Sequence, residues 1–413
     1  MIPDWRRHLS LLCIIFAGEA IFSLPFHIPR FFKPTVLQAF DISNTALGDA
    51  FAVYGLTAML SYLPGGWLAD RYSARHLMTT SLLATAAGGL YLASFPDAAG
   101  LRWLYAWWGM TTILLFWAAM IRATREWGGG AGQGRAFGFL EGGRGVMAAA
   151  SAAIAVGVLA HGLTGAVPDA ASRVSALREV IFFYCGVTAL AALLCAWAIP
   201  QQRADRKTDE TAVSPASALG LGLQAAVVVS AYCAYKGLDN YALYAVSAFG
   251  MNEVEAARFM AGAAWLRPVA AVAAGVMADR VRASTALTVI FLLALLTALI
   301  AATASSVSAT VLMANLLCSV AAVYALRGVY FALTAEVGVP ESRTGVAVGL
   351  VSVLGFTPDI FFAPLTGRLL DAYPGLPGLQ RYFWLLSAFA MLGMAVSLVL
   401  AWRLRRRLPP ERD

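Results

Sequence analysis

The chain of 413 residues is 60% apolar and only 13% charged, and its mean hydropathy is +0.71. Soluble domains carry about 25% charged residues, so this composition excludes an ordinary soluble globule and indicates a surface that faces lipid. The net charge of +7 does not indicate a nucleic-acid partner, because the positive residues follow the pattern of a membrane topology signal.

These positive residues set the predicted orientation in the membrane. Of the 30 Lys and Arg residues, 18 fall in chain ends and loops that we assign to the cytosol, and at most eight, including Arg30 and Lys33, fall on the opposite side. Cytosolic loops of membrane proteins carry an excess of Lys and Arg. We therefore predict a multi-pass inner-membrane protein with both chain ends in the cytosol and no cleaved signal peptide.

Twelve apolar stretches are long enough to cross a membrane, since a spanning helix needs about 20 mainly apolar residues. In chain order, spans 1 to 12 are expected at 9–32, 45–66, 77–95, 101–122, 136–162, 179–199, 218–248, 255–277, 286–305, 309–335, 345–370 and 380–402. The segment 201–217 is polar, carries charges of both signs and predicts a cytosolic linker. The expected fold is an all-α membrane protein of twelve transmembrane helices, in an N-terminal half (1–200) and a C-terminal half (218–413).

The loop between spans 2 and 3 occurs twice in the chain. It reads Gly-Trp-Leu-Ala-Asp-Arg-Tyr-Ser-Ala-Arg over 66–75, and a second version, Gly-Val-Met-Ala-Asp-Arg-Val-Arg, follows about 209 residues later at 275–282. A second pair, 134–138 and 345–349, repeats at about 211 residues. Two echoes at one spacing indicate a tandem duplication of a six-helix unit.

The repeated loop resembles the signature loop of the major facilitator superfamily of secondary transporters. The loop of that family has Gly and then a basic residue where this chain has Ser73 and Ala74, while Arg75 keeps a positive charge one residue on. The resemblance implies two six-helix halves around a central cavity. From the charges of the loop and this likeness, we expect the residues that gate the cytosolic side to be Asp70, Arg71, Arg75, Asp279 and Arg280.

Prolines interrupt three of the expected spans. A membrane helix tolerates such a break where the freed carbonyl groups face protein or water, and broken spans at a repeat interface are typical of transporter substrate sites. The prolines are Pro25, Pro29 and Pro34 in span 1, Pro268 in span 8, and Pro358 and Pro364 in span 11.

Several ionisable residues fall within the expected spans. Each costs about 3 kcal/mol on membrane-insertion scales and is therefore a hypothesis for function. The cations are Arg144, Lys236, Arg267 and Arg327, with Arg30 in the outer part of span 1, and the acids are Glu19, Glu141, Asp239 and Asp359.

Two pairs of these residues are spaced three apart, so that each pair lies on one helix face and can neutralise itself. They are Glu141 with Arg144, and Lys236 with Asp239. Each pair is either a structural ion pair that makes membrane insertion tolerable or part of a binding site, and the spacing leaves both readings open.

Arg267 and Arg327 have no acid within one turn, so each needs a partner on another helix or a substrate. Arg327 lies between Tyr324 and Tyr330 at helical spacing and is the better candidate to face a cavity. Arg267 serves either packing or gating in span 8, or the site itself.

A narrower resemblance concerns the stretches 113–125, 134–138 and 141–145, which look like bacterial relatives of the organophosphate:phosphate antiporters. That family holds phosphate with one basic residue in each of spans 1 and 7, and the matching positions here are Arg30 and Lys236. Because Lys lacks the planar fork of Arg, the substrate need not be a phosphate ester.

The predicted function is secondary transport of a small organic anion by alternating access, coupled to a proton or a counter-ion. The expected substrate-binding residues are Arg30, Lys236, Arg144, Arg327, Glu141, Asp239 and Tyr241. The expected proton-coupling residues are Glu19, Asp359 and His27, although a single His beside a helix break can equally be a plain hydrogen-bonding residue.

Two rival functions remain open: a proton-driven efflux pump for drugs or organic cations, and a membrane sensor that binds a ligand without transporting it. An enzyme is not expected, because the chain has no phosphate-binding Gly-rich loop and no nucleophile or zinc motif. We expect no cofactor and no metal, a monomer in the lipid bilayer, and five cysteines that serve as small core residues without disulfides.

Overall fold

A computed structural model describes residues 4–128, 133–163, 168–201, 215–303, 308–339 and 344–406. Every regular element in these ranges is a helix, as the sequence predicts. Most of the expected linker 201–217 lies outside the described residues.

Contacts within the chain divide it into two compact units. Unit 1 comprises Met1–Thr208, Asp239–Pro268 and Asp359–Arg368, and unit 2 comprises Asp209–Leu238, Val269–Pro358 and Leu369–Asp413. Unit 1 therefore joins the expected N-terminal half to parts of spans 7, 8 and 11. The division of the sequence into halves at 1–200 and 218–413 stays a prediction.

Unit 1 contains spans 1 to 6. Its helices are α1 (Asp4–Ala20), η1 (Ser23–His27), α2 (Ile28–Phe31), α3 (Lys33–Ala39), α4 (Asn44–Arg71), α5 (Ala74–Leu92), α6 (Ala98–Gly109), η2 (Met110–Trp117), α7 (Ala118–Gly128), α8 (Gln133–Gly162) and α9 (Ala170–Ala198). To these it adds α11 (Tyr241–Phe249) and α12 (Glu253–Ala263), with the first residues of α13 (Leu266–Val281) and most of α18 (Pro358–Ala372).

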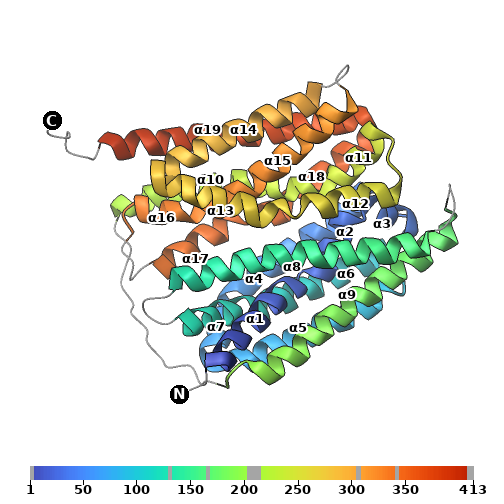
Figure 1. The fold of residues 1–413 in the computed structure, drawn as a ribbon, viewed down its shortest axis with the longest axis horizontal. Coiled ribbons are helices and arrows are strands. Elements are labelled where there is room, and N and C mark those ends of the chain that lie inside the picture. The colour runs from blue at the N-terminus through green and yellow to red at the C-terminus, as the bar shows by residue number, and fades with distance from the viewer. Residues whose placement is uncertain are drawn as a thin grey trace. The chain divides into compact units, whose positions relative to one another are not determined.

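The core of unit 1 forms where α1 packs against α7, α8 and α9, and Figure 1 shows α8 and α9 as long helices on either side of α1. Ile14, Ile21, Met78 and Phe116 are among its fully buried side chains. Small residues let the helices approach closely, as is usual where lipid gives no apolar driving force. A Cβ at Gly89 would lie 2.4 Å from Cys185 Sγ, so only glycine permits the observed contact between α5 and α9.

Span 1 is broken where its prolines predict a break. The α-helix ends at Ala20, a π-helical turn follows at Ser23–His27, and Pro29 and Pro34 each lie in the first turn of a new short helix. Proline is tolerated there because the first N–H groups of a helix have no helical partner.

Spans 8 and 11 are also interrupted. Span 8 is interrupted between Ala263 and Leu266, immediately before Pro268. Span 11 is interrupted before Pro358, whereas Pro364 lies inside α18. Three further interruptions are not marked by a proline: the π-helix η2 in span 4, the 3-10 turn η3 (Leu238–Asn240) in span 7, and the 3-10 turn η4 (Tyr330–Ala332) in span 10.

Unit 2 contains α10 (Pro215–Gly237), α14 (Ala283–Thr303), α15 (Ala309–Val329), η4 (Tyr330–Ala332), α16 (Leu333–Glu336), α17 (Thr344–Gly355) and α19 (Leu376–Arg406). Helices α14 and α19 run side by side (Figure 1). A Cβ at Gly393 would lie 2.3 Å from the Phe291 ring, so the contact again depends on a glycine. Of the five cysteines, Cys318 is exposed and not in the core, contrary to expectation, and all five are free thiols.

Eleven helices in the described part of the chain are long and apolar enough to cross a membrane. They correspond to all the expected spans except span 3. Span 3 is the 19-residue helix α5, whose first turn carries Arg75 and His76 and whose middle contains Thr and Ser. These polar residues lower its hydropathy while it packs inside unit 1 against α9.

Candidate functional site

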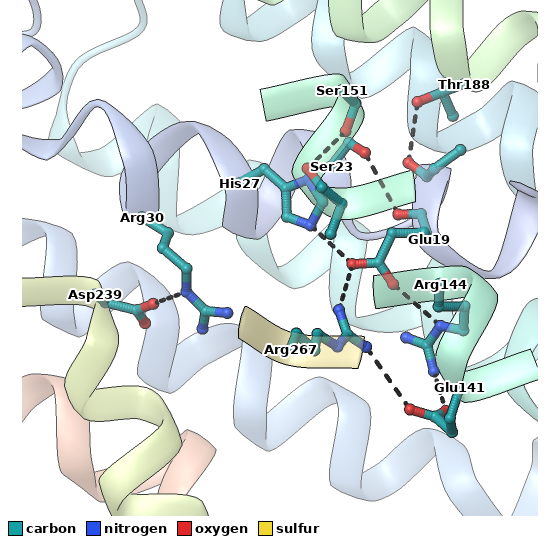
Figure 2. A network of polar contacts seen from close by, with 12 residues as sticks. Glu19, Ser23, His27, Arg30, Glu141, Arg144, Ser151, Thr188, Asp239 and Arg267 are labelled. Atoms are coloured by element: carbon teal, nitrogen blue, oxygen red, sulfur yellow. Dashed lines mark hydrogen bonds and ion pairs between the residues drawn. The ribbon is translucent and has the colours of Figure 1, made fainter. Parts of the chain in front are cut away.

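A network of buried charges in unit 1 surrounds Glu19. Figure 2 shows Arg144, Arg267 and His27 pointing toward its carboxylate from three directions. Arg144 Nε lies 3.1 Å from Oε2, Arg267 Nη1 lies 2.9 Å from Oε1, and His27 Nε2 lies 3.1 Å from Oε1. All four side chains are buried. The carboxylate is thus enclosed by two guanidinium groups and an imidazole.

Glu141 closes this network into a ring of alternating charge. Its carboxylate lies 2.7 Å from Arg144 Nη1 and 3.6 Å from Arg267 Nη2, so each of the two arginines contacts both Glu19 and Glu141 (Figure 2). The Glu141 side chain is 50% exposed, in contrast to the 6% of Glu19. The ring therefore has one closed side and one accessible side.

Backbone interruptions and glycines position the members of this ring. The π-helical turn brings His27 back to Glu19 from eight residues away, and the break in span 8 comes just before Arg267. A Cβ at Gly145 would lie 3.2 Å from Arg267 Cγ, and one at Gly18 would lie 3.4 Å from Arg144 Cδ. The glycines of spans 1 and 5 thus leave room for the two arginine stems.

Two further cations of span 1 hold the interruption in span 7. Arg30 Nε donates to Asp239 Oδ1 at 2.5 Å, and Lys33 Nζ donates to Asn240 Oδ1. Both cations are buried, and the pairs join residues about 200 positions apart in the sequence. Asp239 thus has a partner on another helix, whereas the sequence pointed to Lys236, three residues away, as its partner.

We call the eight residues Glu19, His27, Arg30, Lys33, Glu141, Arg144, Asp239 and Arg267 the charged cluster. As the described residues define it, the cluster contains four permanent cations and three carboxylates. The cluster therefore has more permanent cations than carboxylates. Buried charges of this kind are tolerated when they are paired and hydrogen-bonded.

A further carboxylate outside the cluster, that of Glu253, links the outer end of span 1 to two other helices. It accepts a hydrogen bond from Thr35 Oγ1 at 2.7 Å and one from Arg173 Nε at 2.6 Å. Glu253 lies in the first turn of α12, behind a capping box formed by Asn252 and Glu255, where the helix dipole favours negative charge. The contact joins α3, α9 and α12 within unit 1.

Each copy of the signature loop is stabilised by a charged side chain, which binds the C-terminal end of the preceding helix in one copy and the N-terminal end of the following helix in the other. In unit 1, Arg122 of α7 donates to the carbonyl groups of Ala69 and Tyr72 at the end of α4. In unit 2, Glu336 of α16 accepts from the N–H groups of Ala283 and Ser284 at the start of α14. Both contacts complement the helix dipole.

A search of protein families matches the model of the major facilitator superfamily to residues 15–358. The chain belongs to the major facilitator superfamily. It is therefore a membrane transporter, with a small-molecule substrate and lipid as its surroundings, and not an enzyme.

Relatives of this transporter agree with the assignment. The inner membrane protein YqcE of Escherichia coli strain K12 is 25% identical over 408 residues, which cover 95% of this chain and 94% of that protein. The inner membrane protein YihN of the same organism is 26% identical over 425 residues, which cover 96% of each chain. With the apolar helices, these relatives make it a multi-pass inner-membrane protein.

Solved structures share its fold. A bacterial homologue of the human lysosomal transporter Spinster, in an inward-facing and unoccupied conformation, has a TM-score of 0.75 at 16% identity, over 99% of this chain and 100% of that one. The nucleoside transporter NupG has a TM-score of 0.69 at 12% identity, over 98% and 100%. The narrower resemblance to the organophosphate:phosphate antiporters stays a proposal.

The predicted site residues fall into several groups in this transporter. Glu19, His27, Arg30, Glu141, Arg144 and Asp239 gather in the charged cluster. Tyr241 is buried at the start of α11, and the backbone of Asp359, at the start of α18, packs against Gly55. Lys236 and Arg327 belong to unit 2, where the Arg327 guanidinium lies 3.9 Å from the centre of the Tyr235 ring. The expected gating residues Asp70, Arg71, Asp279 and Arg280 are exposed, and Arg75 is partly exposed.

Sequence reasoning missed some of the residues that carry the site. The sequence predicts Lys33 in an outer loop, but it is buried and bonded to Asn240. Its spacing of three from Arg30 was a usable signal, since that spacing places both cations on one helix face. For Arg267 the sequence does not separate a role in packing or gating from a role in the site, and the structure shows that it contacts both acids of the ring. Apart from their charge, nothing in the sequence indicates the contacts made by Glu253, Arg122 and Glu336.

Proposed function

We propose that this transporter carries a small organic anion, such as a carboxylate or a phosphate ester, by alternating access coupled to protons or to a counter-ion. The observation that supports this most is the charged cluster, in which four buried cations surround three carboxylates. An anion that enters such a site gains charge-assisted hydrogen bonds worth about 1.5–3 kcal/mol each.

The residues proposed to bind the substrate are Arg30, Arg144, Glu141 and Asp239 of the cluster, with Lys236, Arg327 and Tyr241. Glu19, His27 and Asp359 are the proposed proton-coupling groups. Orientation with both chain ends in the cytosol and the gating role of the signature loops also remain proposals.

The pairing of the acids argues against the rival that exports organic cations. Such a pump would bind its substrate through buried carboxylates. Here Glu19, Glu141 and Asp239 each lie within 3.1 Å of an arginine nitrogen, so a cation would have to displace an arginine. A ligand sensor has no such conflict with the geometry, and only a transport measurement separates it from a transporter.

Uptake into proteoliposomes tests the proposal. Purified protein is reconstituted and offered a panel of labelled lactate, glycerol phosphate and the lipophilic cation tetraphenylphosphonium, without a proton gradient, with an inward gradient and with an outward gradient. We expect accumulation of an organic anion and none of the cation. Accumulation of the cation alone would establish the efflux-pump rival, and binding of an anion without uptake would establish the sensor.

A further inference from the structure

The carboxylate of Glu19 is bound as an external carboxylate would be. Arg144 Nε and Arg267 Nη1 donate to its two different oxygens at 3.1 and 2.9 Å. Guanidinium groups are the side chains that proteins use most to recognise carboxylates. Each of these arginines also contacts Glu141, whose side chain is half exposed. A soluble anion arriving from that side would meet donors already arranged around a carboxylate.

His27 supplies the second observation. An ionised carboxylate only accepts hydrogen bonds, so the hydrogen between His27 and Glu19 lies on Nε2, which is 3.1 Å from Oε1. The other ring nitrogen, Nδ1, is buried and makes no hydrogen bond to any described residue. A buried polar atom without a partner costs about 1–3 kcal/mol. In this tautomer Nδ1 is the acceptor atom of the ring, and it is the ring atom at which a further proton would bind.

The groups that face Glu19 and His27 come from each element packed against α1. Helix α8 contributes Arg144 and Glu141, α13 contributes Arg267, and η1 contributes His27 itself. From α9, Tyr184 packs edge-on against the His27 ring at 6.0 Å.

Two neighbours complete these surroundings. Arg30 of α2 lies near enough to His27 to interact electrostatically. Helix α7 also packs on α1, and its Arg122 lies 2.8 Å from Glu126. Two permanent positive charges, those of Arg144 and Arg267, therefore lie against the Glu19 carboxylate.

We propose that the Glu19 carboxylate occupies the position that the carboxylate of the substrate takes, and that a proton delivered through His27 neutralises Glu19 so that the substrate carboxylate replaces it. This deepens the proposed function and rests on it: it names a carboxylate as the substrate group and one proton as the coupled ion.

The exchange balances in protons and in charge. A proton binds His27 Nδ1, and the proton on Nε2 moves to Glu19 Oε1. His27 ends neutral with its proton on Nδ1, and Glu19 ends as a neutral carboxylic acid. Arg144 Nε and Arg267 Nη1 then donate to the incoming carboxylate instead. One proton and one negative charge have been added, so the net charge of the cluster is unchanged and transport of a monocarboxylate is electroneutral.

Acetate is a suitable probe for this exchange, because it reproduces the end of the glutamate side chain. In Glu19→Ala, which leaves the two arginines without that carboxylate, saturating acetate should raise Tm by about 5 °C over sodium chloride of the same ionic strength. The double variant Glu19→Ala with Arg267→Gln should lose most of that gain. Asp49→Ala, which removes a partly exposed carboxylate beside Arg368, should respond to acetate only as the wild-type protein does. An equal effect of acetate and chloride on Glu19→Ala overturns the proposal.

Glu19→Gln covers the case in which the alanine variant does not fold, since the amide keeps the shape of the side chain. Acetate should stabilise the wild-type protein more at pH 6 than at pH 8, because Glu19 must first be protonated. In Glu19→Gln the stabilisation should be the same at both pH values. A pH dependence that persists unchanged in Glu19→Gln overturns the role of Glu19.

The role of His27 has its own readout, the rate of proton uptake that follows rapid mixing with acetate, measured with a pH indicator. Gln at position 27 can still donate to Glu19 but cannot pass a proton on, so His27→Gln should slow uptake on the order of 100-fold. Uptake as fast as in the wild type overturns the relay.

These results are separate from those of the uptake panel. If an organic anion is accumulated but acetate does not rescue Glu19→Ala, the exchange at Glu19 fails and the proposed function stands. If acetate rescues the variant but no organic anion is accumulated, the proposed function fails.

Discussion

The two units bury polar groups of different kinds. Unit 1 pairs Arg30, Arg144 and Arg267 with carboxylates. Unit 2 buries Gln224 and Asn315, which donate to Thr334 Oγ1 and to the Thr297 carbonyl. Unit 2 also places the Arg327 guanidinium over the Tyr235 ring. Unit 1 thus gathers several carboxylate–arginine pairs around Glu19. Unit 2 also buries a charged side chain, Lys236. The gathering of pairs at one place supports the proposal that these charges serve substrate chemistry.

The ion pairs of unit 1 should carry the largest energetic effect. Removing one partner of a buried pair leaves an uncompensated charge and costs about 3–5 kcal/mol. Arg30→Ala and Asp239→Ala should therefore each lower stability strongly, and the double variant should recover much of that loss. Thermal unfolding of the purified variants measures both effects.

A matched pair on the surface of unit 1 is the control for that cycle. Arg368 Nη1 lies 2.9 Å from Asp49 Oδ1, with side chains 57% and 31% exposed. Exposed ion pairs contribute about 0–1 kcal/mol, so the same cycle there should give a small effect. If the buried and exposed cycles agree, burial does not distinguish the charged cluster.

The contacts at the two signature loops should contribute less to stability, and they use charges of opposite sign, a cation at one loop and an anion at the other. Arg122→Gln removes the cation from the end of α4, and Glu336→Gln removes the anion from the start of α14. Each should cost about 1 kcal/mol, the usual size of a helix-capping contact. High salt should narrow the difference between each variant and the wild type, because screening weakens the charge term. Identical unfolding curves for wild type and both variants would remove these contacts from the account.

The sequence predicted the fold for physical reasons that act locally. Apolar runs of the right length predict spanning helices, and the prolines of span 1 marked its breaks. The interruptions η2, η3 and η4 have no proline to mark them. Span 3 is a helix, as the sequence predicts, but its polar first turn lowers its mean hydropathy below that of the other spans.

The site could be predicted only in part. A charge within a span signals a partner, and Glu19, Arg144 and Glu141 were found in this way. The identity of the partner depends on helices that meet far apart in the sequence, as Glu19 and Arg267 do over 248 residues. Lys33 was missed because its position near the end of span 1 looked like a loop, and only the fold shows it buried.

The most direct test of the central claim is the affinity of an organic anion for the cluster. The best-bound anion of the uptake panel is titrated by calorimetry into wild type, Arg144→Gln and Arg368→Gln. Loss of one charge-assisted contact, worth about 1.5–3 kcal/mol, should weaken binding about 10- to 150-fold in Arg144→Gln and leave the exposed control Arg368→Gln unchanged. Equal affinity in all three proteins would contradict the assignment of the anion to the charged cluster.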